Sequence, residues 1–230
     1  MSGGVGVDTD TEEWAFVLSG LDGAVAFQGN RPVCMPVAVS VAHQIERGPA
    51  HVALSPEALW TAIVGAGGAY AEGTTAAEVD AALRADGQPN LTAWPFDATI
   101  EPDAHSERPV GLDFPPWLTA SLDSIPMLRD GAESPTIQHL ASGRPVVLIV
   151  ETTDQFTFPV SGVVTVPPAG VGDDAFHAVT AVGAARTRDG RLWLRIRNSW
   201  GADWGDGGCC WLPLDYLRDY GYSAFSVVVR

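Results

Sequence analysis

The stretch QGNRPVCMPVAVSVAHQIE, residues 28–46, places Cys34 directly ahead of a run of small and apolar residues. Apolar residues recur at every fourth position of this run and a Gly-Pro pair follows it, so we expect a helix over Met35–Arg47 with Cys34 at its N-terminal end. A helix N-terminus and a neighbouring imidazolium both favour the thiolate form of a cysteine. On its own, however, a free cysteine is more often a small buried side chain than a nucleophile. Motifs elsewhere in the chain distinguish a nucleophilic Cys34 from a merely buried one.

Of the five histidines, His177 has the position best suited to meet Cys34. It opens the apolar segment HAVTAVG after the acidic loop GVGDDAF, so we expect it at the beginning of a strand. His43 lies nine residues beyond Cys34 on the same helix, too far along it for contact. The other three lie in polar or loop surroundings and are expected to be solvated: His51, His105 and His139. The alternative for His177 is a purely structural histidine.

The stretch RNSWGADWGDGG, residues 197–208, supplies a partner for that histidine. A catalytic imidazole needs its second ring nitrogen held, because this fixes the tautomer and the ring angle. The amide oxygen of Asn198 can hold it, and Trp200 can shield the bond from water. The alternative is a turn, rich in Gly and Trp, that only connects two strands.

The first half of the chain favours helices. Ser55–Val64 has an N-cap serine followed by proline, and Thr74–Ala85 has a capping threonine with a glutamate in its first turn, so we expect a helix in each. Residues 87–134 are rich in Pro and Asp and predict long loops with a short helix near Trp117–Leu122.

The second half favours strands. Six segments separated by Gly, Pro and Asp indicate an antiparallel sheet or barrel: GRPVVLIVET, FTFPVSGVVTV, HAVTAVGAAR, RLWLRIRNSW, CCWLPLDYL and FSVVVR. The fold class is therefore α+β. We expect a single domain over residues 1–230, with a mainly helical lobe over about 1–134 and a mainly β lobe over about 135–230. A cleft between two such lobes would let one residue from each meet.

The charge composition of the chain limits the kinds of molecule that it is expected to bind. The formal net charge is -15, and every one of the 13 basic residues is arginine, so nucleic acid and anionic membranes are not expected to bind. No secretion signal and no membrane-spanning run is visible, and the three cysteines, Cys34, Cys209 and Cys210, form no disulfide framework, so we expect a cytoplasmic protein. Cys209 and Cys210 are expected as small strand residues. We expect no metal and no cofactor.

These motifs together resemble the papain-like (C1) cysteine peptidases, from about Gly23 to Val229. QGNRPVC is similar to the segment with that family's oxyanion glutamine and nucleophile, with the same six-residue step from Gln28 to Cys34. HAVTAVG resembles the histidine segment, 143 residues beyond Cys34, and NSWGADWGDGG resembles the asparagine and tryptophan motif, another 21 residues on. The glycine pair that follows LSPEALW, at positions 67 and 68, looks like the family's pair along the substrate groove.

The resemblance implies a papain-like fold, with a helical N-terminal lobe packed on an antiparallel β-barrel lobe and the active site in the cleft between them. It assigns Cys34 as nucleophile and His177 as the base that then protonates the leaving group. Asn198 would orient His177, with Trp200 in support. Gln28 would form the oxyanion hole with the backbone N–H of Cys34. The family also implies a depressed pKa for the cysteine. Gly67 and Gly68 are the implied substrate-binding residues.

The sequence departs from the family at several points. Arg31 stands where the family has a disulfide-bonded cysteine, and Met35 stands where it has a tryptophan. Only 33 residues precede Cys34, so we expect a divergent bacterial member without an inhibitory prosegment. The Pro-rich insertion Thr92–Pro135 could shape the cleft. Its acidic residues either favour a cationic substrate or are simply solvated: Glu101, Asp103, Glu107, Asp113 and Asp123.

Three function classes follow from this. A cysteine peptidase acting on a peptide or protein is the first. The second is an acyltransferase, ligase or cyclase that uses the same Cys-His-Asn thioester chemistry on a small peptide or natural product. The third is a non-catalytic binding module of the same fold. The substrate and the oligomeric state stay open.

Overall fold

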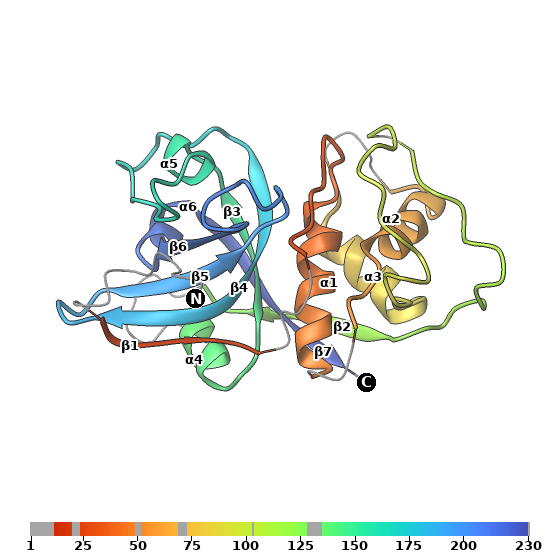
Figure 1. Cartoon of the computed structure of the whole chain (residues 1–230), viewed down its shortest axis with the longest axis horizontal. Helices are drawn as coiled ribbons and strands as arrows, with labels where there is room; N and C mark the ends of the chain where they lie inside the picture. Colours follow the sequence, from red (N-terminus) through yellow and green to blue (C-terminus); the bar gives the residue numbers. More distant parts are fainter. Residues whose placement is uncertain are drawn as a thin grey trace.

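The computed structural model describes residues 12–19, 24–48, 52–68, 73–102, 104–127 and 135–229. A helical lobe and a β lobe lie side by side, and the helix that follows Gln28 lies where they meet (Figure 1). The helical lobe contains α1 (Cys34–Glu46), α2 (Pro56–Gly65) and α3 (Ala76–Ala85). Three short helices accompany the sheet: α4 (Pro135–Ala141), α5 (Asp154–Thr157) and α6 (Tyr216–Tyr220).

The three helices of the helical lobe begin where the sequence signals predict. Ser55 caps α2 by accepting a hydrogen bond from the backbone N–H of Ala58 at 3.3 Å. Thr75 and Glu78 form a reciprocal capping box at the start of α3. In contrast, α1 has no side-chain cap at its N-terminus, where Val33 is the N-cap residue. The start of α1 therefore lacks the side-chain hydrogen bond that α2 and α3 each have.

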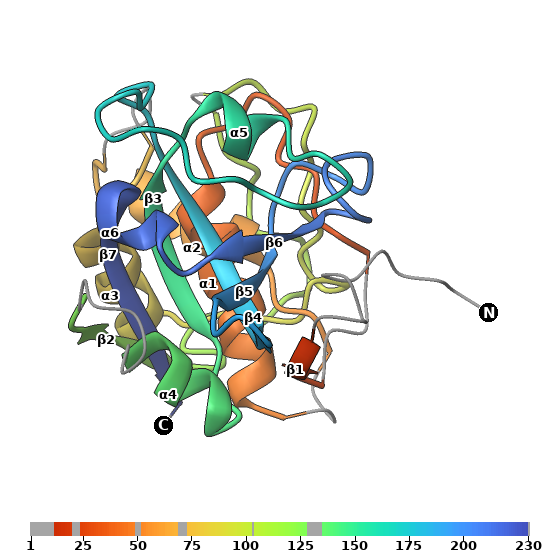
Figure 2. The ribbon, with the colours of Figure 1, turned by 90° about the vertical axis from the view of Figure 1, so that its left-hand side faces the viewer.

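The β lobe is built on one antiparallel sheet of seven strands in the order β2-β7-β3-β4-β5-β6, with β1 paired to β4. Turned by 90°, the molecule shows α1 behind the middle of the sheet and α4 and α6 on the other side (Figure 2). The strands are β1 (Glu12–Val17), β2 (Ala120–Ile125), β3 (Val146–Glu151), β4 (Phe176–Thr187), β5 (Leu192–Arg197), β6 (Cys209–Pro213) and β7 (Gly221–Val229). Both β1 and β2 come before residue 134 and still belong to this sheet.

Small side chains let α1 lie close against the sheet. Ala38 and Ala42 belong to a buried cluster that also contains Ala178 of β4 and Val227 of β7. The hydroxyl of Thr180 on β4 donates to the backbone oxygen of Ala38 at 2.9 Å. This packing fixes the first turn of α1 relative to the first residues of β4.

Two predictions about elements are wrong. The segment near Trp117–Leu122 is not a helix, because Ala120–Ile125 pairs along its whole length with β7 as strand β2. The segment FTFPVSGVVTV is not a regular strand. Its beginning lies in α5, where the hydroxyl of Thr153 accepts from the backbone N–H of Phe156 at 3.2 Å and starts a helical turn.

Within the described ranges, none of the helices combines the length and the apolarity that crossing a bilayer requires. All three cysteines carry free thiols.

Candidate active site

The clearest feature of the site is the pair His177 and Asn198. His177 lies near the start of β4, and Asn198 directly follows the neighbouring strand β5, so antiparallel pairing brings the two together. His177 Nε2 and Asn198 Oδ1 are 2.6 Å apart. The backbone N–H of Ser199 donates to the same Oδ1 at 2.8 Å, which identifies that atom as the amide oxygen. Nε2 therefore carries the proton, and Nδ1 keeps the lone pair of a base.

Aromatic rings enclose this pair. Trp200 lies against the imidazole with ring centroids 4.5 Å apart, and Phe156 meets it edge-on at 6.3 Å. Trp204 packs against both Phe156 and Trp200. His177 is only 6% exposed, and this burial lowers the pKa of its imidazole to about 4, although the hydrogen bond that Nε2 donates to Asn198 acts in the opposite direction. At neutral pH the imidazole is thus an unprotonated base.

Cys34 is the first residue of α1 and packs, partly buried, against the cluster that contains Met35 and Ala178. Burial raises the pKa of the Cys34 thiol, while backbone N–H groups of Ala178, Met35 and Cys34 itself favour the thiolate. The prediction of a depressed pKa for the Cys34 thiol is therefore wrong, because desolvation outweighs the effect of the backbone N–H groups. The contact with the backbone N–H of Ala178 brings Cys34 to the residue that directly follows His177 in β4.

Gln28 is held at both ends of its side chain. Its Nε2 donates to the backbone oxygen of Arg31 at 2.8 Å, and its Oε1 accepts from the hydroxyl of Ser199 at 2.5 Å. The backbone N–H of Gln28 also donates to the backbone oxygen of Ser199 at 2.8 Å. An amide nitrogen carries two hydrogens, so Nε2 can donate a second bond. Hydrogen bonds thus run without a break from His177 through Asn198 and Ser199 to Gln28.

Sequence reasoning missed Ser199. It lies between Asn198 and Trp200 in the NSW triplet, and its contact with Gln28 spans 171 residues of sequence. The only available signal was its position inside the motif. Phe156 was also missed, because its segment was predicted as a strand.

The glycine pair lies at the end of α2. Gly67 has φ +83°, and the backbone N–H groups of Gly67 and Gly68 donate to Val64 and Ile63 at 2.9 Å each, which closes the helix with a Schellman motif. A Cβ on Gly68 would lie 2.5 Å from Ile63 Cγ2. Helix termination therefore accounts for both glycines, and their contact with a substrate stays a prediction.

The remaining residues that the sequence singled out differ in their exposure. The exposed acidic residues of the insertion are Glu101, Glu107, Asp113 and Asp123, while Asp103 lies outside the described residues. His105 is exposed as predicted, and His51 lies outside the described residues. His139 lies half-buried in α4, so the prediction that it is solvated is wrong. The described acidic residues of the insertion are therefore open to solvent, and their effect on a cationic substrate stays a prediction.

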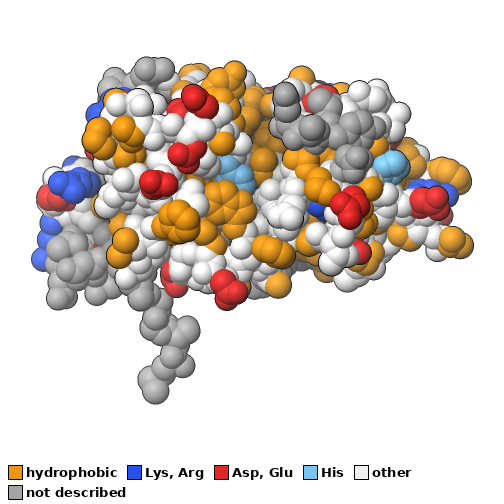
Figure 3. Space-filling view, turned by 90° about the horizontal axis from the view of Figure 1, so that it is seen from above, with side chains coloured by type: hydrophobic (Ala, Val, Ile, Leu, Met, Phe, Trp, Pro, Cys, Tyr) orange, Lys and Arg blue, Asp and Glu red, His pale blue; other side chains and the backbone are white. Residues whose placement is uncertain are grey.

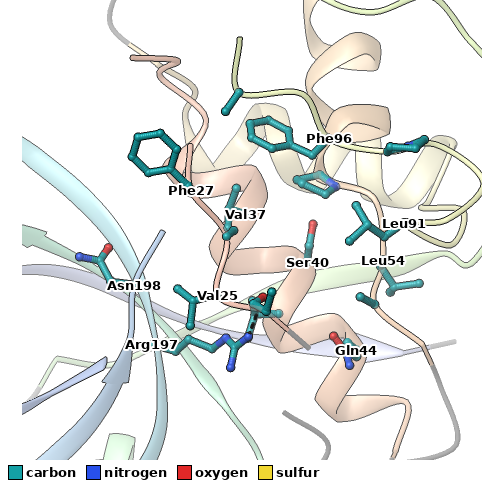
Figure 4. Close-up of a pocket in the computed structure, with 17 residues that line it drawn as sticks. Val25, Phe27, Val37, Ser40, Gln44, Leu54, Leu91, Phe96, Arg197 and Asn198 are labelled. Atoms are coloured by element: carbon teal, nitrogen blue, oxygen red, sulfur yellow. Dashed lines mark hydrogen bonds between the residues drawn. The ribbon is translucent and has the colours of Figure 1, made fainter. Parts of the chain in front are cut away.

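From above, the surface is hollowed between the two lobes, with hydrophobic side chains in the groove and acidic side chains on both lobes beside it (Figure 3). A mainly apolar cavity of about 390 Å³ lies beside α1. Its residues include Phe27 and Phe96 at one end and Arg197 and Gln44 at the other (Figure 4). Of the residues assigned to the site, only Asn198 lines it.

The comparisons with known proteins identify a family for this chain. The model of the papain family of cysteine proteases matches residues 67–221, which include His177 and Asn198. The thiol protease aleurain of Arabidopsis thaliana is 42% identical over 117 residues, 50% of this chain and 30% of that protein. Cysteine endopeptidase RepA of Oryza sativa subsp. japonica is 41% identical over 73 residues, 31% of this chain and 18% of that protein. The matches therefore span less than a third of either relative.

Solved structures show the same fold over most of the chain. Xylellain, a cysteine protease from Xylella fastidiosa, has a TM-score of 0.73 at 20% identity, covering 96% of this chain and 88% of that one. The bromelain protease from Ananas comosus, solved in complex with the E64 inhibitor, has a TM-score of 0.68 at 20% identity, covering 90% and 94%. The α+β papain-like fold predicted from the sequence is confirmed, and the chain belongs to the papain family of cysteine proteases.

Proposed function

We propose that the chain is a cysteine peptidase in which Cys34 attacks the peptide carbonyl and His177 is the general base. The observation that carries this proposal is the hydrogen bond of 2.6 Å between His177 Nε2 and Asn198 Oδ1, because it leaves Nδ1 as the unprotonated ring nitrogen. Family membership supports it, since the two relatives named above are called a cysteine endopeptidase and a thiol protease.

The first half of the reaction forms a thioester. As Cys34 Sγ bonds to the carbonyl carbon, its proton passes to His177 Nδ1 and the carbonyl oxygen becomes an oxyanion. The backbone N–H of Cys34 and the second hydrogen of Gln28 Nε2 donate to that oxygen. The oxyanion collapses, the C–N bond breaks, and His177 gives its proton to the departing amine.

The second half returns the enzyme to its starting state. Water attacks the thioester carbon, its proton passes to His177 Nδ1, and the C–S bond breaks as the thiol regains a proton and the acid leaves. If an amine takes the place of water, the product is a new amide, which is the acyl-transfer alternative. Phe176, directly before His177, packs against Tyr222 with the ring centroids 4.9 Å apart and the planes tilted by 53°, and both rings are more than half exposed. They offer an apolar surface for a peptide substrate beside the base.

The test measures hydrolysis of a mixed fluorogenic peptide library by the native chain, Cys34→Ser and His177→Gln. Cys209→Ser is the matched control, because Cys209 is also a partly exposed free thiol. We expect loss of turnover in the first two variants and native turnover in the control. Turnover by Cys34→Ser at the native rate would refute the assignment of the nucleophile. Mass spectrometry of the products with added amine separates hydrolysis from acyl transfer.

A further inference from the structure

Arg31 is a buried arginine between the two residues on which the proposed chemistry depends. It lies three residues after Gln28 and three before Cys34, and it is 1% exposed. Arg31 stands where the family has a disulfide-bonded cysteine. Long charged side chains are almost never fully buried unless they are paired, so its surroundings need an explanation.

The guanidinium of Arg31 forms a two-pronged ion pair with Glu57 in the first turn of α2. Nη1 lies 2.5 Å from Oε2 and Nη2 lies 3.0 Å from Oε1, and both side chains are 0% exposed. This fork fixes the orientation of the guanidinium as well as its position. Glu57 Oε1 also accepts from the backbone N–H of Ser106 at 3.0 Å.

The Pro-rich insertion completes the enclosure. Arg31 Nη1 donates to the backbone oxygen of Asp97 at 2.9 Å, and Nη2 lies 3.4 Å from that of Ala104. The ring of Phe96 lies 4.9 Å from the guanidinium carbon and that of Trp60 lies 5.9 Å away. One side chain thus joins α2 and the insertion to the segment that precedes α1.

The backbone of Arg31 transmits this anchoring to the oxyanion amide. Its carbonyl oxygen accepts from Gln28 Nε2 at 2.8 Å and from the backbone N–H of Val33 at 2.9 Å. The backbone N–H of Arg31 in turn donates to the backbone oxygen of Gln28 at 3.3 Å. α1 has no side-chain cap of its own. The ion pair with Glu57 holds Arg31, and with it the turn that precedes α1, in place. A displacement of Arg31 would move the acceptor that aims Gln28.

We propose that Arg31, through its ion pair with Glu57, is a positioning residue that aims the side-chain amide of Gln28 at the oxyanion. The inference rests on the proposed role of Gln28. A buried ion pair adds little net stability compared with apolar residues of similar volume. The ion pair between Arg31 and Glu57 therefore matters for the position of the turn that it holds. In the papain-like family a disulfide holds this segment. Here a non-covalent ion pair holds it, and no oxidant is needed to form it.

The test replaces both charges by apolar side chains of similar length, in Arg31→Met/Glu57→Met, so that no unpaired charge is buried. The measurements are the thermal midpoint, kcat and KM on a fluorogenic peptide, and the rate at which iodoacetamide alkylates Cys34. Alkylation creates no oxyanion, so it reports on the thiol alone. Arg84→Met is the control, because Arg84 forms a surface ion pair with Asp80 at 2.7 Å.

We expect the folded double variant to lose kcat by about tenfold or more, while KM and the alkylation rate change by less than about twofold. Gln28→Ala alone should lose about 10²- to 10³-fold in kcat, and adding the double substitution to it should cause no further loss. A native kcat in the folded double variant, or losses that multiply in the triple variant, would overturn the inference. A native kcat in Gln28→Ala would instead overturn the proposed oxyanion role.

If the double variant does not fold, Arg31→Lys provides the same measurement. Lysine keeps the charge opposite Glu57 but lacks the fork that fixes orientation. We expect a lower kcat with KM and the alkylation rate preserved, again without effect in the Gln28→Ala background. Native kcat in this variant would contradict the proposal.

Discussion

The burial of His177 should make the fold sensitive to acid. Its pKa falls from the ordinary 6.5 to about 4 in the folded chain, so the unfolded chain takes up this proton first as the pH drops. The contribution to stability is complete above pH 6.5 and is lost as the pH falls towards 4. At 1.36 kcal/mol per unit of pKa, acidification through this window should remove about 3 kcal/mol of unfolding free energy.

Urea unfolding of the native chain and of His177→Gln between pH 7 and pH 4 measures this contribution. Glutamine keeps an N–H that can reach Asn198 but does not titrate, so we expect the native chain to lose about 3 kcal/mol more than the variant over the window. His105→Gln removes an exposed histidine and is the matched control. Equal losses in the native chain and His177→Gln would refute the argument that burial keeps this imidazole neutral.

Three further changes test the site. Asn198→Asp puts a carboxylate in hydrogen-bond contact with His177, which should raise the pKa of the imidazole. The acid limb of the kcat/KM profile should then shift to higher pH, and an unshifted limb would count against contact between the two residues. Ser199→Ala removes the donor to Gln28, and steady-state kinetics should show kcat lower by about tenfold at unchanged KM, whereas native kcat would mean that Gln28 needs no such support. Phe156→Ala empties the centre of the aromatic cluster, and urea unfolding should show a loss of about 3–5 kcal/mol; a loss below about 1 kcal/mol would mean that the cluster collapses around the gap.

The elements with explicit local signals could be predicted from the sequence. Ser55 before a proline and Thr75 three residues before Glu78 mark the starts of α2 and α3, and both caps are present in the structure. Strand β4 has a long apolar run, which made its position clear. In these elements the local sequence and the fold agree.

The wrong predictions arise where a distant partner decides the structure. ASLDSI carries little strand pattern, and it becomes β2 because β7, about a hundred residues later in the sequence, pairs with it. FTFPVSGVVTV is rich in β-favouring residues, yet the cap at Thr153 takes its first residues into α5. The pairing partner and the competing cap are not visible in composition.

In the site, too, the residues with a local sequence motif were predicted and those that depend on distant contacts were not. The motifs pointed to His177 and Asn198, and the structure brings them into a hydrogen bond. The direction of the Cys34 pKa shift was wrong, because desolvation depends on the side chains that surround the thiol in space. Ser199 and the Arg31–Glu57 pair escaped for a similar reason, since each acts through a contact between distant parts of the chain.

The central claim is that Cys34 is a nucleophile activated by His177, and labelling with a peptidyl epoxide tests it most directly. The adduct is located by mass spectrometry in the native chain and its rate compared with that in His177→Gln. The account predicts one adduct, on Cys34, with Cys209 and Cys210 unmodified and a much slower reaction in the variant. An adduct on Cys209, or an equal rate without His177, would contradict it.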